Sequence, residues 1–300
     1  GWALDASGVS AQAAAAAASA LGVTGEPRLE WGSWVVGSND GTGPSLTLSA
    51  DGQGALSYAD PRNDVWYCDP SVREEATSSD GAVEGGATEG AGAAPSVVEP
   101  CGERDLGPAP SEDEAARQLR DLMSRLGVDP AGYEVVVEDY GDPYVFATAY
   151  HVVDGQRTGL TWSASFSGAG VTWLSGFTAS LVDLGEYDVV SPAEAVERVN
   201  DPRFGAGWSG PIALARDASA AAETGVVDEP DGTPPAPAAP GSAFAWPVTD
   251  VTIVEARLGV AVTSTRDGAA VLAPTYELTA DDGSVWSVIA VAERHLDFAR

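Results

Sequence analysis

Residue types that could carry out chemistry are few in this chain of 300 residues. Its two histidines, His151 and His295, lie far apart, and His151 stands in the middle of a strand-like run. The sequence contains no His-Glu-x-x-His, Cys-x-x-Cys or Gly-x-Ser-x-Gly motif, so the usual signatures of a zinc site and of a serine nucleophile are missing. We therefore expect no catalytic residue, no metal ligand and no cofactor-binding residue, and we interpret the protein as a non-enzyme.

Carboxylates are the one abundant reactive group, with 45 Asp and Glu residues. A glycoside hydrolase needs two facing carboxyls, but with so many acids the sequence does not single out a pair. A polysaccharide-acting hydrolase or a glycan-binding protein, using acidic residues and tryptophan platforms, therefore remains the alternative. Weak Ca²⁺ binding at an acidic turn such as Asp281-Asp282 also stays open, although no EF-hand loop is present.

Tryptophans in strand-like runs are the candidates for a binding surface. Trp31, Trp34, Trp162 and Trp173 lie in such runs, where exposed rings could contact a partner or stack on sugars. In an unbroken strand Trp31 and Trp34, three residues apart, would point to opposite faces of the sheet. One of these two is then expected in the core, and ordinary packing is the competing interpretation for all four.

The charge balance excludes several classes of partner. The formal net charge is −30, and all 15 basic residues are arginines without any basic run. Nucleic acids and anionic membranes are bound through clustered basic side chains, so neither is expected. No run of 18 apolar residues is present that could span a bilayer.

The two cysteines, Cys68 and Cys101, bracket a Gly/Ala/Glu/Ser-rich stretch that cannot pack by itself. Two unrelated thiols would be the interpretation for a reducing compartment. We favour a disulfide, which would constrain the unfolded chain by about 3–4 kcal/mol in the chain-entropy model. A disulfide indicates an oxidising, extracytoplasmic location, either secreted or anchored at the cell surface.

Three helices are expected to position these residues, at about 10–21, 111–126 and 191–199. Each begins at a capping serine. The second and third begin with a Ser-x-x-Glu capping box. Strand-like runs separated by turn residues follow each helix. After the first helix they are 28–38, 45–51 and 54–60, and after the second they are 133–141, 144–154, 158–168 and 171–183. After the third helix they are 251–264, 270–280 and 284–293. The sequence predicts an α+β fold of repeated modules, each with one helix packed on an antiparallel meander.

Composition suggests two domains. The first covers residues 1–107 and contains a mobile, stapled loop at 69–100. The second covers residues 108–300, holds one or two modules and contains a flexible Pro/Ala-rich insertion at about 228–243. The chain begins at Gly1 without a basic leader, which is typical of an ectodomain whose signal or anchor has been removed.

Two segments carry a resemblance to a known family. In "GEYDVVSPAEAVERV" (185–199) the matching residues are Gly185, Tyr187, Ser191, Glu194 and Ala195. In "APTYELTADDGSVWSVIAV" (273–291) they are Pro274, Tyr276, Gly283 and Val291. Over about 111–298 the chain resembles the PepSY-like extracytoplasmic domains of actinobacterial cell-envelope proteins, with the N-terminal third similar to a degenerate copy.

The resemblance implies a strand with a Gly-x-Tyr motif that runs into a Ser-Pro-x-Glu-Ala helix, followed later by a Pro-x-Tyr hairpin. It also implies a membrane-anchored or lipid-anchored envelope protein that regulates or inhibits a partner protein by contact. The family pattern carries no catalytic residues to transfer. We therefore expect a non-enzymatic ectodomain that binds a protein partner through a β-sheet surface.

Overall fold

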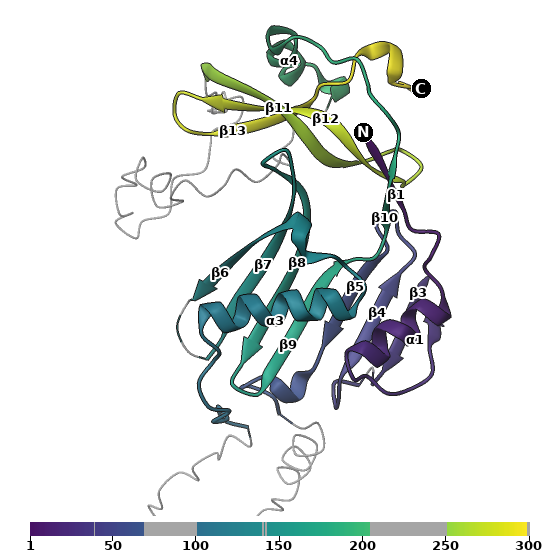
Figure 1. The fold of residues 1–300 in the computed structure, drawn as a ribbon, viewed down its shortest axis with the longest axis vertical. Coiled ribbons are helices and arrows are strands. Elements are labelled where there is room, and N and C mark those ends of the chain that lie inside the picture. The colour runs from purple at the N-terminus through teal and green to yellow at the C-terminus, as the bar shows by residue number, and fades with distance from the viewer. Residues whose placement is uncertain (39, 69–100, 140, 142, 205–250, 299–300) are drawn as a thin grey trace, which may run out of the picture.

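The computed structural model describes residues 1–38, 40–68, 101–139, 141, 143–204 and 251–298 (Figure 1). The expected loop at 69–100 and the insertion at 228–243 lie outside these residues. The α-helices are α1 (Ala11–Ala20), α3 (Glu112–Arg125) and α4 (Pro192–Val199). None of the helices in the described ranges is long and apolar enough to cross a membrane.

Each helix begins where the sequence predicts. The side chains of Ser10, Ser111 and Ser191 accept hydrogen bonds from the backbone N–H three residues later, which satisfies a donor that the first helical turn leaves free. Gly22 and Gly127, both with positive φ, follow the first two helices and allow the chain to turn away. The three predicted helices are confirmed.

Strands form two antiparallel sheets. The eight-stranded sheet has the order β2-β3-β4-β5-β9-β8-β7-β6, and the five-stranded sheet has the order β10-β1-β12-β11 with β13 also paired to β12. The bounds are β1 Trp2–Asp5, β2 Arg28–Glu30, β3 Ser33–Gly37, β4 Ser45–Ser49, β5 Ala55–Ala59, β6 Tyr133–Asp139, β7 Val145–Val153, β8 Gln156–Ser167, β9 Gly170–Phe177, β10 Ser180–Asp183, β11 Ile253–Ser264, β12 Ala270–Ala280 and β13 Val285–Ile289. The α+β class is confirmed.

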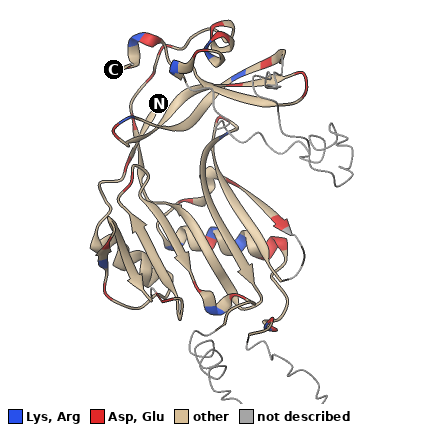
Figure 2. Ribbon diagram, turned by 180° about the vertical axis from the view of Figure 1, so that it is seen from behind, with Lys and Arg blue, Asp and Glu red and all other residues tan. Residues whose placement is uncertain are grey.

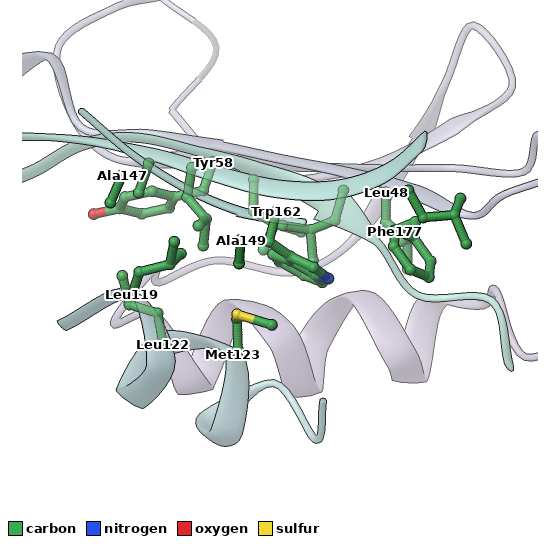
Figure 3. Close-up of a cluster of buried hydrophobic side chains, with 14 of the residues drawn as sticks. Leu48, Tyr58, Leu119, Leu122, Met123, Ala147, Ala149, Trp162 and Phe177 are labelled. Atoms are coloured by element: carbon green, nitrogen blue, oxygen red, sulfur yellow. The ribbon is translucent and has the colours of Figure 1, made fainter. Parts of the chain in front are cut away.

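Helices α1 and α3 lie side by side on one face of the eight-stranded sheet (Figure 1). The main core fills the space between them and the strands, with Leu119 and Met123 of α3 fully buried opposite Trp162 of β8 (Figure 3). Apolar residues at every second strand position point into this core, as in "SLTLS", where Leu46 and Leu48 are buried. The other face of the sheet carries the alternate residues.

The centre of the eight-stranded sheet joins parts of the chain that are distant in sequence. Strand β5 pairs with β9 from Ala55↔Phe177 to Ala59↔Trp173. The expected boundary near residue 107 therefore falls between strands of one continuous sheet. Strand β1 also crosses that boundary, because it pairs with β10 and β12 in the five-stranded sheet. Long-range strand pairing of this kind leaves no mark in local sequence patterns.

The five-stranded sheet carries α4 and a second, smaller core (Figure 1). Within it, Tyr276 and Leu278 of β12 are buried on the face that α4 covers. The Tyr276 hydroxyl donates to the Val190 carbonyl oxygen at 3.1 Å, and Val189 forms an isolated bridge with Val291. The two segments that carry the family resemblance thus contact each other. Residues 185–187 are not in a strand, however, because β10 ends at Asp183.

The expected strand 28–38 is interrupted by a tight turn. Glu30 pairs with Ser33, so Trp31 and Gly32 form a two-residue hairpin loop, and both have positive φ. The prediction of an unbroken strand was wrong, because a Trp-Gly pair is not among the usual hairpin-turn dipeptides. The turn separates the three-residue strand β2 from β3 and leaves β2 at the sheet edge.

The two sheets meet at the β7–β8 hairpin. Arg257 of β11 donates to the Gly155 carbonyl oxygen at 3.2 Å, and Gly52 forms an isolated bridge with Ala269. The end of the Gln156 side chain occupies the space where a β-carbon at Gly259 would lie, so any other residue at position 259 would have to displace it. These contacts hold the five-stranded sheet above one end of the eight-stranded sheet.

Candidate functional site

The helix-free face of the eight-stranded sheet, called the open face below, is the candidate binding surface. Among the described residues no helix packs on this face, as the view from behind shows (Figure 2). Register assigns its residues, because directly opposed residues of paired strands share a face. Thr47 opposes Ser57, Ser57 opposes Ser175, and Ser175 opposes Ser163, in one row across four strands.

Hydroxyl side chains cover the middle of the open face. Cross-strand pairs link some of them, since Ser33 Oγ lies 3.1 Å from Ser49 Oγ and Thr148 Oγ1 lies 3.2 Å from Ser163 Oγ. Within the described ranges, the hydroxyls of Ser57 and Ser175 have no hydrogen-bond partner in the protein. Such hydroxyls can donate to and accept from a ligand.

A shallow hollow of about 320 Å³ indents this face near its upper end. Its lining includes Thr47, Ser49, Gln53, Ser57, Thr161 and Ser175. The lining combines hydroxyl and amide groups with apolar surface and carries no charge, and the hollow is open to solvent rather than a closed cavity. It offers hydrogen bonds across a broad contact and does not enclose a small reacting molecule.

An aromatic row crosses the lower part of the open face. Trp173 opposes Ser165, and Ser165 opposes Phe146, so the two rings lie two strands apart on one face, about 10 Å from each other. Their exposed fractions are 39 % for Trp173 and 37 % for Phe146. Tyr144 lies beside Phe146, with ring centroids 6.5 Å apart. The row presents two apolar ring surfaces on either side of a serine.

The central strands of the sheet are free of charge. Strands β3, β4, β5 and β9 contain no Asp, Glu, Lys, Arg or His, although the whole chain carries a net charge of −30. Charged ribbon segments lie on the helices, turns and outer strands instead (Figure 2). At the β6 corner of the open face Arg157 Nε lies 3.2 Å from Glu134 Oε2, and its guanidinium covers the Tyr150 ring at 3.7 Å. The middle of the face is therefore electrically neutral.

A hydrogen bond fixes the lower rim of the open face. The Tyr144 hydroxyl donates to Asp64 Oδ1 at 2.6 Å, which ties the start of β7 to the loop after β5. Burial, together with this carboxylate, raises the pKa of Tyr144 to about 12. The phenol therefore stays protonated and keeps donating across the physiological pH range.

The four predicted tryptophans separate into different environments. Trp162 is completely buried in the main core, so its assignment to a binding surface was wrong; its strand position faces the helices. Trp34 is half-buried against the same core. Trp173 lies exposed on the open face, and Trp31 is fully exposed at the β2–β3 turn. The structure thus brings only Trp173 to the candidate site.

The other candidate groups are dispersed. His151 Nδ1 lies 3.0 Å from Thr158 Oγ1, and burial lowers the pKa of this histidine. His295 lies elsewhere, 3.2 Å from Asp188. At the acidic turn, Asp282 Oδ1 accepts the Ser284 backbone N–H at 2.8 Å. Hydrogen bonds from the Ser284 side chain and from this N–H lower the pKa of Asp282. In the part of the chain that the structure covers, no three His, Cys, Asp or Glu residues are grouped so that they could hold a metal ion.

Cys68 and Cys101 form a disulfide, with their Cα atoms 5.4 Å apart, as predicted. Next to it, the Arg104 backbone N–H donates to the Val65 carbonyl oxygen at 2.8 Å. The Arg104 side chain also donates to the Arg62 carbonyl oxygen at 2.9 Å. The disulfide and these bonds hold two chain segments together at the lower end of the sheet, below the aromatic row.

The hydroxyls of the open face were missed in the sequence analysis. Their signal is the strict alternation of Ser or Thr with apolar residues in "SLTLS" and "TWSAS". Alternation of this kind marks a strand with one buried face. What it does not give is the pairing that assembles several such strands into one broad surface.

No protein-family model matches the chain, and no curated protein matches it. Among solved structures, the C-terminal domain of YpeB from Bacillus megaterium aligns with 93 % of this chain and 91 % of that chain, at 11 % sequence identity and a TM-score of 0.30. That score lies below the level at which a likeness supports an argument about fold or function.

Proposed function

We propose that the protein is a non-enzymatic extracytoplasmic ectodomain that binds a protein partner through the open face. The observation that carries this proposal is the neutrality of that face in so acidic a chain. Exposed strands that need only to stay soluble ordinarily carry charges on their solvent side. The missing charge in its middle and the exposed aromatic rings are two features that this face shares with contact surfaces, whose core is depleted in charged residues and enriched in aromatic ones.

The size of the open face agrees with this role. Seven spacings of about 4.8 Å between eight strands make it about 34 Å wide. Seven of these strands, all except the three-residue β2, have five residues or more, which gives a height of about 17 Å or more. The resulting area of roughly 600–800 Å² approaches the contribution of one partner to a stable protein–protein interface.

The order of elements supports a repeated-module organisation with a PepSY-like relation. Helix α1 is followed by the meander β2–β5, and α3 by the meander β6–β9, with both helices on the same face. The last strands of the two meanders pair at the centre of the sheet. Helix α4 followed by β11–β13 is the third unit in the proposal. An extracytoplasmic location is supported by the Cys68–Cys101 disulfide.

The experiment compares three baits on envelope extract: the wild-type chain, Ser57→Arg in the middle of the open face, and Ser19→Arg on the exposed side of α1. Both serines are exposed, so neither change should affect folding. We expect a protein that the wild type and Ser19→Arg retain equally and that Ser57→Arg retains at least tenfold less, by quantitative mass spectrometry. Equal retention by all three baits would contradict the proposal.

Glycan binding is a second candidate, favoured by the aromatic row of Trp173 and Phe146. Rings on one face can stack on alternate sugars of an extended chain, and the intervening Ser165 lies between them in the register. Affinity electrophoresis in soluble envelope polysaccharide tests this candidate. Retardation that Trp173→Ala abolishes and Trp31→Asn preserves would assign the open face to a glycan and would displace the protein partner.

A further inference from the structure

The turn between β2 and β3 places a tryptophan in a backbone conformation that suits it poorly. Trp31 has φ 52°, and Gly32 has φ 81°, as a two-residue hairpin turn with positive φ at both positions requires. Bulky side chains are rare in this left-handed region because the β-carbon crowds the backbone. Asn, Asp and Gly are the residues that hairpin turns ordinarily use at this position.

The same chain supplies an internal comparison. Val153 pairs with Gln156 in the β7–β8 hairpin, so Asp154 and Gly155 form a second two-residue loop, with φ 50° and 75°. Asp154 and Trp31 are the non-glycine residues with positive φ in the described ranges. One turn therefore uses a residue suited to this conformation, whereas the other uses tryptophan. Backbone geometry alone does not account for the tryptophan.

Packing does not account for Trp31 either. Its relative exposure is 103 %, so the indole contacts no core that could offset the strained backbone. Leu29, two residues earlier, is 63 % exposed. Together they form an apolar projection at the edge of the eight-stranded sheet, in a chain of net charge −30. An exposed, strained residue of this kind marks a functional position.

We propose that Trp31 is an anchor residue that inserts into an apolar socket of a protein partner. Tryptophan is the residue type most often found at the centre of binding energy in protein interfaces. The net charge of −30 predicts basic residues around that socket. The same charge opposes an anionic lipid surface, and one indole with one leucine buries too little apolar area to hold the protein on a bilayer.

The inference rests on the proposed function for the class of partner. The β2–β3 hairpin, which carries Trp31, lies next to the candidate site. Ser33 follows the turn directly, and its hydroxyl contacts that of Ser49, which lines the hollow of the open face. A partner on the open face can therefore reach Trp31. The two proposals use different residues, so variants of each can be measured separately.

The first test is stability, for which Trp31→Asn is compared with Asp154→Asn. Asparagine tolerates positive φ, so Trp31→Asn should raise the Tm by about 1–3 °C while removing no buried surface. Asp154→Asn, a change between two turn-compatible residues, should leave the Tm unchanged. A lower Tm for Trp31→Asn would show that the indole serves folding, and would overturn the proposal.

The second test is contact, for which p-benzoylphenylalanine replaces Trp31, or Asp154 as the control, in the full chain. We expect one cross-linked protein from position 31 and none from position 154. Unlabelled wild-type protein should compete for this cross-link at least tenfold better than Trp31→Asn. Absence of the cross-link, or equal competition by the two proteins, overturns the role of Trp31.

Two further outcomes separate the possible explanations. If Ser57→Arg fails to compete but Trp31→Asn competes like the wild type, the open face binds the partner and the anchor role of Trp31 is wrong. Co-sedimentation of the wild type, but not Trp31→Asn, with phosphatidylcholine and phosphatidylglycerol vesicles would assign Trp31 to a bilayer and overturn the protein socket.

Discussion

The indole ring of Trp162 lies directly against the backbone of Gly176 on the neighbouring strand, in the space that any side chain at position 176 would occupy. The largest buried side chain of the main core is thus seated on a glycine of β9. The ring lies in the main core together with buried residues of the helices that pack on the sheet. It also keeps Trp162 away from the open face on the opposite side.

Gly176→Ala is expected to lower the free energy of unfolding by about 1–3 kcal/mol, because the new methyl group must displace Trp162 in a densely packed core. Chemical denaturation measures the change. Gly102→Ala is the control, since a β-carbon at position 102 would meet nothing within 4 Å. Equal stability of the two variants would contradict the seating of Trp162 on Gly176.

Arg198 of α4 should be the most important charged residue for the five-stranded sheet. Its buried guanidinium donates to the carbonyl oxygens of Ile289 at 3.0 Å and Val291 at 2.8 Å, and lies over the Phe204 ring at 4.4 Å. Arg198→Ala leaves both carbonyls without this donor, and should cost about 2–4 kcal/mol of stability.

Hydrogen exchange of α4 and β13 amides, together with denaturant unfolding, would measure the effect of Arg198→Ala. The matched control is Arg203→Ala, because Arg203 makes its ion pairs at the exposed surface. Exposed pairs contribute about 0–1 kcal/mol. A similar loss for both variants would show that the buried position of Arg198 has no special role.

Stability should depend on the protonation of His151. Burial lowers the pKa of His151 from its ordinary value of 6.5, so folding favours the neutral ring. The stability that the neutral ring of His151 contributes to the fold is complete above about pH 6.5. It is lost as the pH falls from there through the lowered pKa. The Tm of the wild type should therefore fall more steeply on acidification below about pH 6.5 than that of His151→Gln. An equal dependence of the Tm on pH in the two proteins would show that protonation of His151 does not cause the loss of stability.

Reduction of the Cys68–Cys101 disulfide should destabilise the fold by up to about 3–4 kcal/mol, because it frees a loop with a sequence separation of 33 residues in the unfolded chain. Denaturant unfolding with and without dithiothreitol measures this loss. The double variant Cys68→Ser/Cys101→Ser should match the reduced wild type and should not respond to dithiothreitol. A loss of stability of that double variant in dithiothreitol would show that the reductant acts at a site other than the disulfide.

Local signals predicted the elements well. Capping serines placed the start of all three helices, glycines placed the end of the first two, and Asp281-Asp282-Gly283 placed the β12–β13 hairpin. The Trp31–Gly32 turn could not be predicted, because tryptophan carries no preference for positive φ. Hydrophobicity also did not separate Trp162 from Trp173, since both lie in alternating strands and only the sheet pairing decides which face each one occupies.

The arrangement of the sheets was beyond local patterns. Neither the pairing of β5 with β9 nor the place of β1 between β10 and β12 follows from residues near those strands. The open face was missed for the same reason. Its serines and threonines are visible in the sequence, whereas their assembly into one neutral surface depends on contacts between distant segments.

The position of β1 also has a consequence for biosynthesis. Its partners are Ser180 to Asp183 and, much later in the sequence, Val271 and Leu272. During translation β1 can pair with β10 once residues 180–183 have been made, but its other edge stays unpaired until residues 271 and 272 follow. Completion of the upper sheet is therefore a late event, and a newly made chain that is cut short before residue 270 would expose an adhesive β-edge to chaperones and proteases.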